Sequence, residues 1–206
     1  MRRPIFVAIT LVAFALGVGG GYLWQQRSQS ALQLQRATVL VDSARRVPDF
    51  QLQDHDRRRF TREQLNGRWT LLFFGYTHCP DICPLTLAQA KDFYRRLEGT
   101  PFRADTQVIF VSVDPKRDHP GTLKRYVGYF DPDFVGVTGE KAQLDELTQP
   151  LGIFYAYHGE GDDYLVDHSS TMLLVDPLTR VHAIFSAPHQ GDVLASDYVA
   201  IRQAAS

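Results

Sequence analysis

The chain has two cysteines, Cys79 and Cys83, and only three residues separate them. Thiolates bind soft metal ions and exchange disulfides, so a closely spaced pair is suited to either chemistry. A structural disulfide at this spacing would close a very short loop and would therefore restrict the unfolded chain little. The spacing favours a functional dithiol over a structural disulfide or two unrelated core thiols.

A buried strand followed by a helix is predicted to position this pair. The run WTLLFFGY, from Trp69 to Tyr76, has the length and continuous apolar character of a strand covered on both faces. Apolar residues then recur at helical spacing from Leu87 to Leu97. Pro84 suits the first helical position, which places Cys83 at the amino-terminal edge of the helix and Cys79 in the preceding loop. Unpaired amides at that edge lower the pKa of a thiol.

The remaining segments after Pro48 alternate between strand-like and helix-like patterns, which predicts an α/β fold. Further strands are predicted at Gln107–Val113, Phe134–Val137, Ile153–Tyr157, Thr171–Asp176 and Val181–Ser186. Further helices are predicted at Thr122–Phe130, Lys141–Thr148 and Val193–Ala204. A hairpin is predicted from Phe50–Gln53 and Arg58–Phe60, followed by a brief helix with a capping box at Thr61 and Gln64.

The amino-terminal segment predicts a membrane anchor. Ile5 to Trp24 is an uncharged stretch, and its length matches the ~20 residues that cross a bilayer as a helix. A cleaved signal peptide, the alternative, has an apolar region of only ~7–15 residues. Flanking arginines favour a cytoplasmic amino terminus. The predicted division is a cytoplasmic tail (1–4), an inner-membrane anchor (5–24), a tether (25–46) and a domain (47–206) in the periplasm or an equivalent space, where dithiols can be oxidised.

Charge narrows the class of partner. The net charge is −1, and after residue 46 the chain carries sixteen Lys and Arg against twenty-two Asp and Glu. This mildly acidic balance argues against nucleic-acid binding, which needs basic residues concentrated on the folded domain. We expect a monomer whose partner is a protein or an ion.

A histidine could complete a metal site with the two thiolates, because two thiolates and an imidazole form a three-coordinate site that favours copper. His168, in VDHSST, falls in a predicted loop at the start of a strand, although a histidine chosen by position alone is more often a surface or core residue. His78 is expected to point away from its neighbour Cys79. The other histidines are expected to be solvated: His55, His119, His158, His182 and His189.

Three blocks of sequence resemble one family. GRWTLLFFGYTHCPDICPLTL, VIFVSVDPKRD and YLVDHSSTMLLVDP are similar to the SCO/SenC family of membrane-anchored copper chaperones for respiratory oxidase assembly. The resemblance extends from about Pro48 to the carboxyl terminus. It departs from the usual family pattern in two turns, DHDRRRF and DPLTR.

The resemblance implies a thioredoxin-like fold in which Cys79, Cys83 and His168 converge on one copper ion, Cu(I) or Cu(II). It also implies delivery of that copper to the binuclear copper centre of cytochrome c oxidase subunit II. Asp114 and Asp118, in VDPKRD, resemble family positions near the site, and no ligand role is predicted for them.

Three functions fit these features. A copper metallochaperone requires no covalent chemistry and would not be an enzyme. A thiol-disulfide oxidoreductase would reduce the oxidase's copper-site cysteines, with Cys79 attacking and Cys83 resolving the mixed disulfide. The common oxidoreductase spacing, however, has two residues between the cysteines. A thiol peroxidase would use one cysteine of low pKa. The oxidation state of the copper and the oxidase served are open at this stage.

Overall fold

The computed structural model describes residues 34–40, 45–159, 161 and 163–205, and an eight-stranded mixed sheet forms their centre. The strand order is β1-β10-β9-β4-β5-β6-β2-β3, and β7 and β8 form a separate two-stranded sheet. The strands are β1 (Ala37–Val39), β2 (Gln51–Asp54), β3 (Arg59–Thr61), β4 (Trp69–Gly75), β5 (Thr106–Ser112), β6 (Val135–Thr138), β7 (Tyr155–His158), β8 (Leu165–His168), β9 (Met172–Val175) and β10 (Val181–Phe185). The helices are η1 (Arg62–Leu65), α2 (Ile82–Arg96), α3 (Pro120–Phe130), α4 (Lys141–Thr148) and α5 (Gly191–Ala204).

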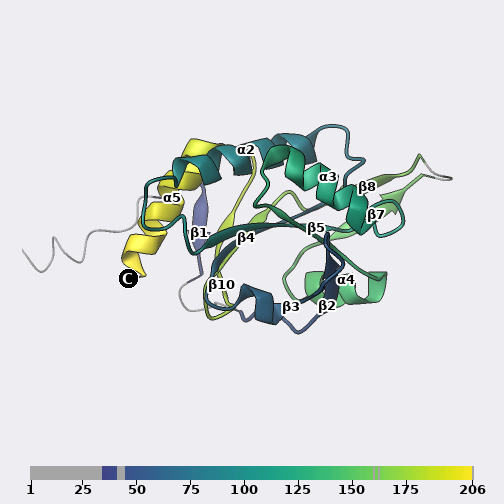
Figure 1. The fold of residues 1–206 in the computed structure, drawn as a ribbon, viewed down its shortest axis with the longest axis horizontal. Coiled ribbons are helices and arrows are strands. Elements are labelled where there is room, and N and C mark those ends of the chain that lie inside the picture. The colour runs from purple at the N-terminus through teal and green to yellow at the C-terminus, as the bar shows by residue number, and fades with distance from the viewer. Residues whose placement is uncertain (1–33, 41–44, 160, 162, 206) are drawn as a thin grey trace, which may run out of the picture. The chain divides into compact units, whose positions relative to one another are not determined.

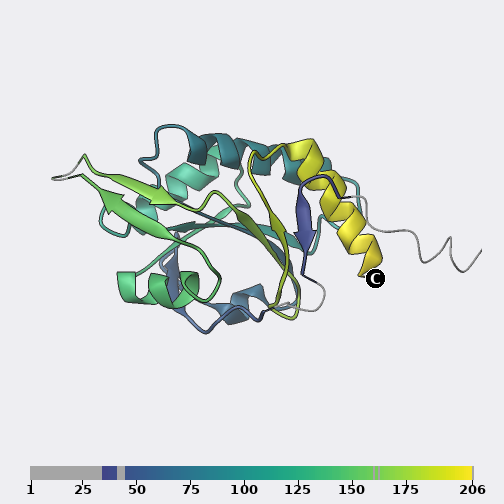
Figure 2. The same cartoon turned by 180° about the vertical axis from the view of Figure 1, so that it is seen from behind.

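The core lies on both sides of the two parallel strands β4 and β5. Every residue of these strands is buried. Helices α2, α3 and α5 cover one face of the sheet, and α4 lies on the other (Figure 1; Figure 2 shows the same layers from behind). Cover on both faces explains why these strands are continuous apolar runs rather than alternating ones.

Strand pairing brings two distant parts of the chain to one end of the sheet. Strand β9 is antiparallel to β4, with Met172 opposite Phe73. The residues that enter β9 therefore lie near the carboxyl end of β4, where the cysteine loop begins. Strand β8 comes just before these residues and ends at His168. The β7–β8 hairpin extends beyond the main sheet at the right of Figure 1.

Most predicted elements of the domain are confirmed, within a few residues at their ends. The hairpin β2–β3 forms, and the side chain of Gln64 accepts a hydrogen bond from the Thr61 amide, as the capping box predicts. The brief helix there is a 3-10 helix. Strand β8 was not predicted, and His168 is its last residue rather than part of a loop. The segment LVDH is too short and too polar to indicate a strand without its partner β7.

Strand β1 lies inside the stretch 25–46 that the sequence analysis assigned to a tether. It pairs with β10 at the edge of the sheet, and the amides of Gln35, Arg36 and Ala37 donate to the buried carboxylate of Asp197. The predicted anchor, Ile5–Trp24, lies outside the described residues. Within the described part of the chain, no helix combines the length and apolarity needed to cross a membrane.

Candidate metal centre

The two cysteines lie where β4 gives way to α2. Cys83 is the second residue of α2 and is fully buried, whereas Cys79 lies in the preceding loop and is partly buried. The amide of Cys83 donates to the sulfur of Cys79 at 3.4 Å. Both cysteines are free thiols. This is the predicted arrangement, with an unpaired helix amide directed at a sulfur atom.

Gly75, the last residue of β4, makes room for the buried sulfur. A Cβ atom at this position would lie 2.8 Å from the Sγ of Cys83 and 2.9 Å from the Cε2 of Phe110. A larger residue would therefore push Cys83 out of its place. The sequence analysis did not select Gly75, although a glycine at the end of an otherwise apolar strand is a signal of close approach.

His168 reaches the same place from the hairpin. Its Nε2 atom lies 3.1 Å from the Sγ of Cys83, and its Nδ1 lies 3.1 Å from the carbonyl oxygen of Ser169. A carbonyl can only accept, so Nδ1 carries the proton and Nε2 is available as a ligand. The rings of Tyr76 and Phe73 pack edge-on against the imidazole, with centroids 5.9 Å and 6.1 Å away.

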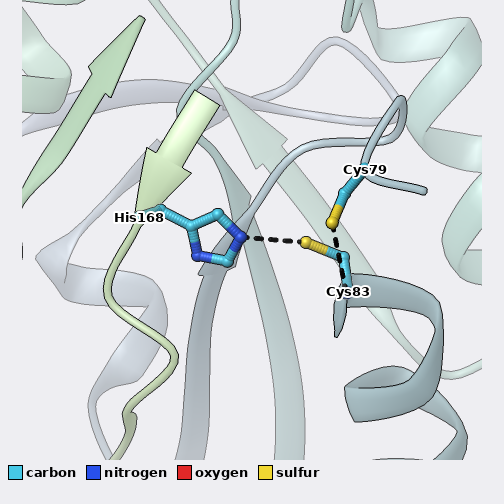
Figure 3. A group of neighbouring side chains, drawn as sticks. All are labelled: Cys79, Cys83 and His168. Atoms are coloured by element: carbon cyan, nitrogen blue, oxygen red, sulfur yellow. Dashed lines mark hydrogen bonds between the residues drawn. The ribbon is translucent and has the colours of Figure 1, made fainter. Parts of the chain in front are cut away.

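The three predicted site residues therefore converge. The sulfurs of Cys79 and Cys83 and a ring nitrogen of His168 all lie within 4.8 Å of one another. Figure 3 shows the three side chains directed toward one another. Within the described residues, no other group of three or more His, Cys, Asp or Glu side chains has this compactness. His168 lies 85 residues beyond Cys83 in the sequence, so the fold alone creates the cluster.

The two thiols differ sharply in acidity. Donation from the Cys83 thiol, helped by the backbone amides of Asp81 and Cys83, lowers the pKa of Cys79 to about 4 against the opposing effect of burial. The same thiol–thiolate hydrogen bond, together with burial, raises the pKa of Cys83. At neutral pH the pair therefore holds one thiolate, at Cys79, and one proton, on Cys83.

This arrangement suits a soft cation or a disulfide exchange reaction. A metal ion bound by both sulfurs would displace the remaining proton, so its affinity would rise with pH. An imidazole whose other ring nitrogen donates to a backbone carbonyl is the common form of a histidine ligand. Two sulfurs and one nitrogen match the preferences of copper better than those of hard cations such as Mg²⁺ and Ca²⁺.

Three of the other histidines differ from the expectation that they are solvated. The side chain of His55 is only 15% exposed, and its Nδ1 accepts from the amide of Gly136 at 3.0 Å. The ring of His182 is partly buried and packs edge-on against Trp69 at 5.1 Å. His189 is also partly buried, and its Nε2 lies 2.7 Å from the carbonyl oxygen of Ser170. Burial lowers the pKa of His182 and of His189. Tertiary packing of this kind leaves no pattern in the local sequence.

The fold and the cluster together define a thioredoxin-like α/β domain that presents two cysteines and one histidine at the carboxyl end of a central strand. The chain belongs to the SCO1/SenC family, whose model matches residues 40–203. It is 36% identical over 167 residues to the mitochondrial protein SCO2 homolog of Homo sapiens. The aligned part makes up 80% of this chain and 63% of that protein. It is 35% identical over 180 residues to a SCO2-like protein of Rickettsia conorii, with 85% of this chain and 87% of that protein covered.

Solved structures agree with the family assignment. The crystal structure of Arabidopsis thaliana ScoI, determined with copper bound, superposes with a TM-score of 0.71 at 35% identity and covers 76% of this chain and 99% of that one. The solution structure of apo Sco1 from Thermus thermophilus gives a TM-score of 0.70 at 34% identity, with 85% and 98% covered. The expected thioredoxin-like domain is thereby confirmed.

Proposed function

We propose that this chain is a copper chaperone that binds one copper ion through Cys79, Cys83 and His168. The observation that carries the proposal is the convergence of the three potential ligand atoms within 4.8 Å. A thiolate already present at Cys79 means that, of the two cysteines, only Cys83 must lose a proton when the metal binds, and Nε2 of His168 faces the Cys83 sulfur at 3.1 Å. The copper-bound state of the similar Arabidopsis thaliana ScoI supports copper as the metal.

The proposed destination of the copper is the binuclear copper centre of cytochrome c oxidase subunit II. Two observations support this step. The chain belongs to the SCO1/SenC family, and its three sequence blocks resemble those of copper chaperones for oxidase assembly. Cys79 is the partly exposed sulfur, so an incoming ligand from the partner can reach the metal on that side while Cys83 stays buried. Stepwise exchange of ligands then moves the copper without covalent chemistry.

Anaerobic titration of the reduced full chain in detergent with Cu(I), against a competing chelator, tests the binding. One tight equivalent is the expected result. Copper-loaded chain is then mixed with the copper-free soluble domain of subunit II, and copper should appear in that domain. Absence of tight binding would overturn the proposal. Binding without transfer would leave a copper-binding protein that serves another partner.

A second function, reduction of a partner's disulfide, is favoured by the acidity of Cys79. A partly exposed thiolate can attack a disulfide, and Cys83 lies close enough to resolve the mixed disulfide. This chemistry leaves His168 without a role. Equal rates of disulfide reduction by wild type and by His168→Ala would show that reduction, if present, is separate from metal binding.

Membrane attachment belongs to the same proposal. The uncharged stretch Ile5–Trp24 would anchor the chain in the inner membrane, with residues 1–4 in the cytoplasm and the domain, linked by the segment that begins at residue 25, in the periplasm or an equivalent space. Two results are expected: the chain stays in the membrane fraction after extraction at high pH, and protease added outside the inner membrane digests the domain. Release of the chain by high pH would indicate a cleaved or peripheral form.

A further inference from the structure

The segment Ser112–Asp118, sequence SVDPKRD, contacts both parts of the chain that carry the proposed ligands. We propose that Asp118 is a positioning residue that fixes the Cys79 loop through Thr77, and that the same segment holds the strand of His168. The inference rests on the proposed function and deepens it. It gives a role to the two aspartates of VDPKRD, for which no ligand role was predicted.

Asp118 is tied to the loop by a dense set of hydrogen bonds. Its side chain is fully buried, and one carboxylate oxygen accepts from the hydroxyl of Thr77 at 2.5 Å. The other oxygen accepts from the amide of Thr77 at 2.8 Å and from the hydroxyl of Ser112 at 2.6 Å. The Nδ1 atom of His78 lies 3.6 Å from one oxygen of the same carboxylate.

These bonds restrict where the loop can lie. A carboxylate buried without its donors is strongly unfavourable, so any shift of Thr77 that breaks its two bonds to Asp118 carries a large free-energy cost. Thr77 precedes Cys79 by two residues, in a loop without regular secondary structure between β4 and α2. The amide of Cys79 in turn donates to the carbonyl of Tyr76, which links the cysteine to the restrained part of the loop.

The other end of the segment holds the hairpin. Asp114 is also fully buried and accepts from Arg117 at 2.6 Å and from the hydroxyl of Tyr164 at 2.5 Å. The guanidinium of Arg117 lies 3.7 Å from the centroid of the Tyr164 ring and donates to the carbonyl of Tyr164 at 2.9 Å. Tyr164 directly precedes β8, the strand that ends at His168. The two ligand-bearing parts are therefore attached to one short segment.

The test compares two substitutions at Thr77 in the full chain. Thr77→Val keeps the branched shape and removes only the hydroxyl donor, whereas Thr77→Ser keeps the donor. We expect Thr77→Val to weaken Cu(I) binding by about 10-fold, the usual scale for residues that support a ligand. Thr77→Ser should restore most of the affinity. Equal affinities in Thr77→Val and wild type would overturn the inference.

Asp118→Ala removes all three bonds and is compared with Asp197→Ala. Asp197 is a matched control because it is also buried and accepts three backbone amides, but it ties β1 to α5 rather than the cysteine loop. Both variants should lower the melting temperature, and only Asp118→Ala should lower the copper affinity, by more than Thr77→Val does. Equal loss of affinity in both would mean that Asp118 acts only through general stability.

A measurement without copper separates this inference from the proposed function. In dithiothreitol redox buffers, two electrons and two protons pass from dithiothreitol to a Cys79–Cys83 disulfide, which gives two thiols and the cyclic disulfide of the reagent. Thr77→Val should change this equilibrium constant by about threefold or more, because it moves one sulfur relative to the other. If wild type bound no copper, the proposed function would fail. The change in the equilibrium constant of Thr77→Val would still show whether Asp118 positions the cysteine loop through Thr77.

Discussion

The two parts of the chain that supply the candidate ligands differ in how firmly the fold holds them. The cysteines follow β4, in which every residue is buried and paired with β5, and four of its residues also pair with β9. His168 ends β8, whose only strand partner in the described chain is β7, and most residues of this hairpin are exposed or partly exposed. The comparison indicates that sheet pairing makes the thiols the fixed half of the site, whereas the imidazole depends on the hairpin and on its contacts with Asp114 and Arg117.

Removal of a cysteine should have the largest effect on copper binding. Loss of a residue that only hydrogen-bonds a metal ligand weakens metal binding by up to roughly 100-fold. We expect Cys83→Ser to weaken Cu(I) binding by more than this, because a thiolate ligand itself is lost. Cys79→Ser should have a similar effect. Competition with a chelator measures both. Near-normal affinity in either variant would contradict the idea that the thiols are the fixed half.

The low pKa of Cys79 should have a second large effect, on how the alkylation rate of this cysteine depends on pH. A pKa lowered to about 4 means that the thiolate is present above pH 4 and is lost as the pH falls through that value. The rate of Cys79 alkylation should therefore be nearly constant from pH 6 to 8, whereas an ordinary thiol, with a pKa of about 8.5, reacts up to ~100-fold faster over that range. Mass spectrometry of the peptide follows the reaction, and glutathione in the same tube is the control. A steep rise at Cys79 would contradict the assignment.

Loss of the histidine should have an intermediate effect. His168→Ala leaves both thiolates in place, so we expect copper to stay bound with an affinity about 10–100-fold lower. His158→Ala is the matched control, because His158 lies on the same hairpin and is mostly exposed. Its affinity should equal that of wild type. A complete loss of copper in His168→Ala would reverse the ranking of the two halves.

A substitution at Gly75, which packs against Cys83, should have the smallest effect on copper affinity. Gly75→Ala would bring a Cβ to 2.8 Å from the Sγ of Cys83. We expect a destabilisation of about 1–3 kcal/mol from overpacking, with only a severalfold loss of copper affinity. Gly128→Ala in α3 is the control, since its Cβ would meet no atom within 4 Å and alanine favours a helix. Denaturant unfolding measures the free energy of unfolding of both variants. Equal values would show that Gly75 is not needed to make room for Cys83.

The sequence predicted the fixed half of the site better than the half that the hairpin carries. Strand β4 leaves a continuous apolar run in the sequence and helix α2 a helical period, and the prolines beside the cysteines mark where the helix begins. Strand β8 has no such pattern, because its place depends on pairing with β7 and on contacts between Tyr164 and Asp114. His168 was therefore selected mainly through family resemblance. Thr77 was not selected, because its contacts with Asp118 exist only in the folded chain. Gly75 was not selected either, although a glycine at the end of an apolar strand is a signal of close approach.

The central claim is that one copper ion binds to residues from both halves, and X-ray absorption of the Cu(I)-loaded full chain tests it most directly. The account predicts two sulfur ligands and one nitrogen ligand in wild type, with the nitrogen lost in His168→Ala and both sulfurs retained. A wild-type site with sulfur ligands alone, or a nitrogen that persists in His168→Ala, would contradict it.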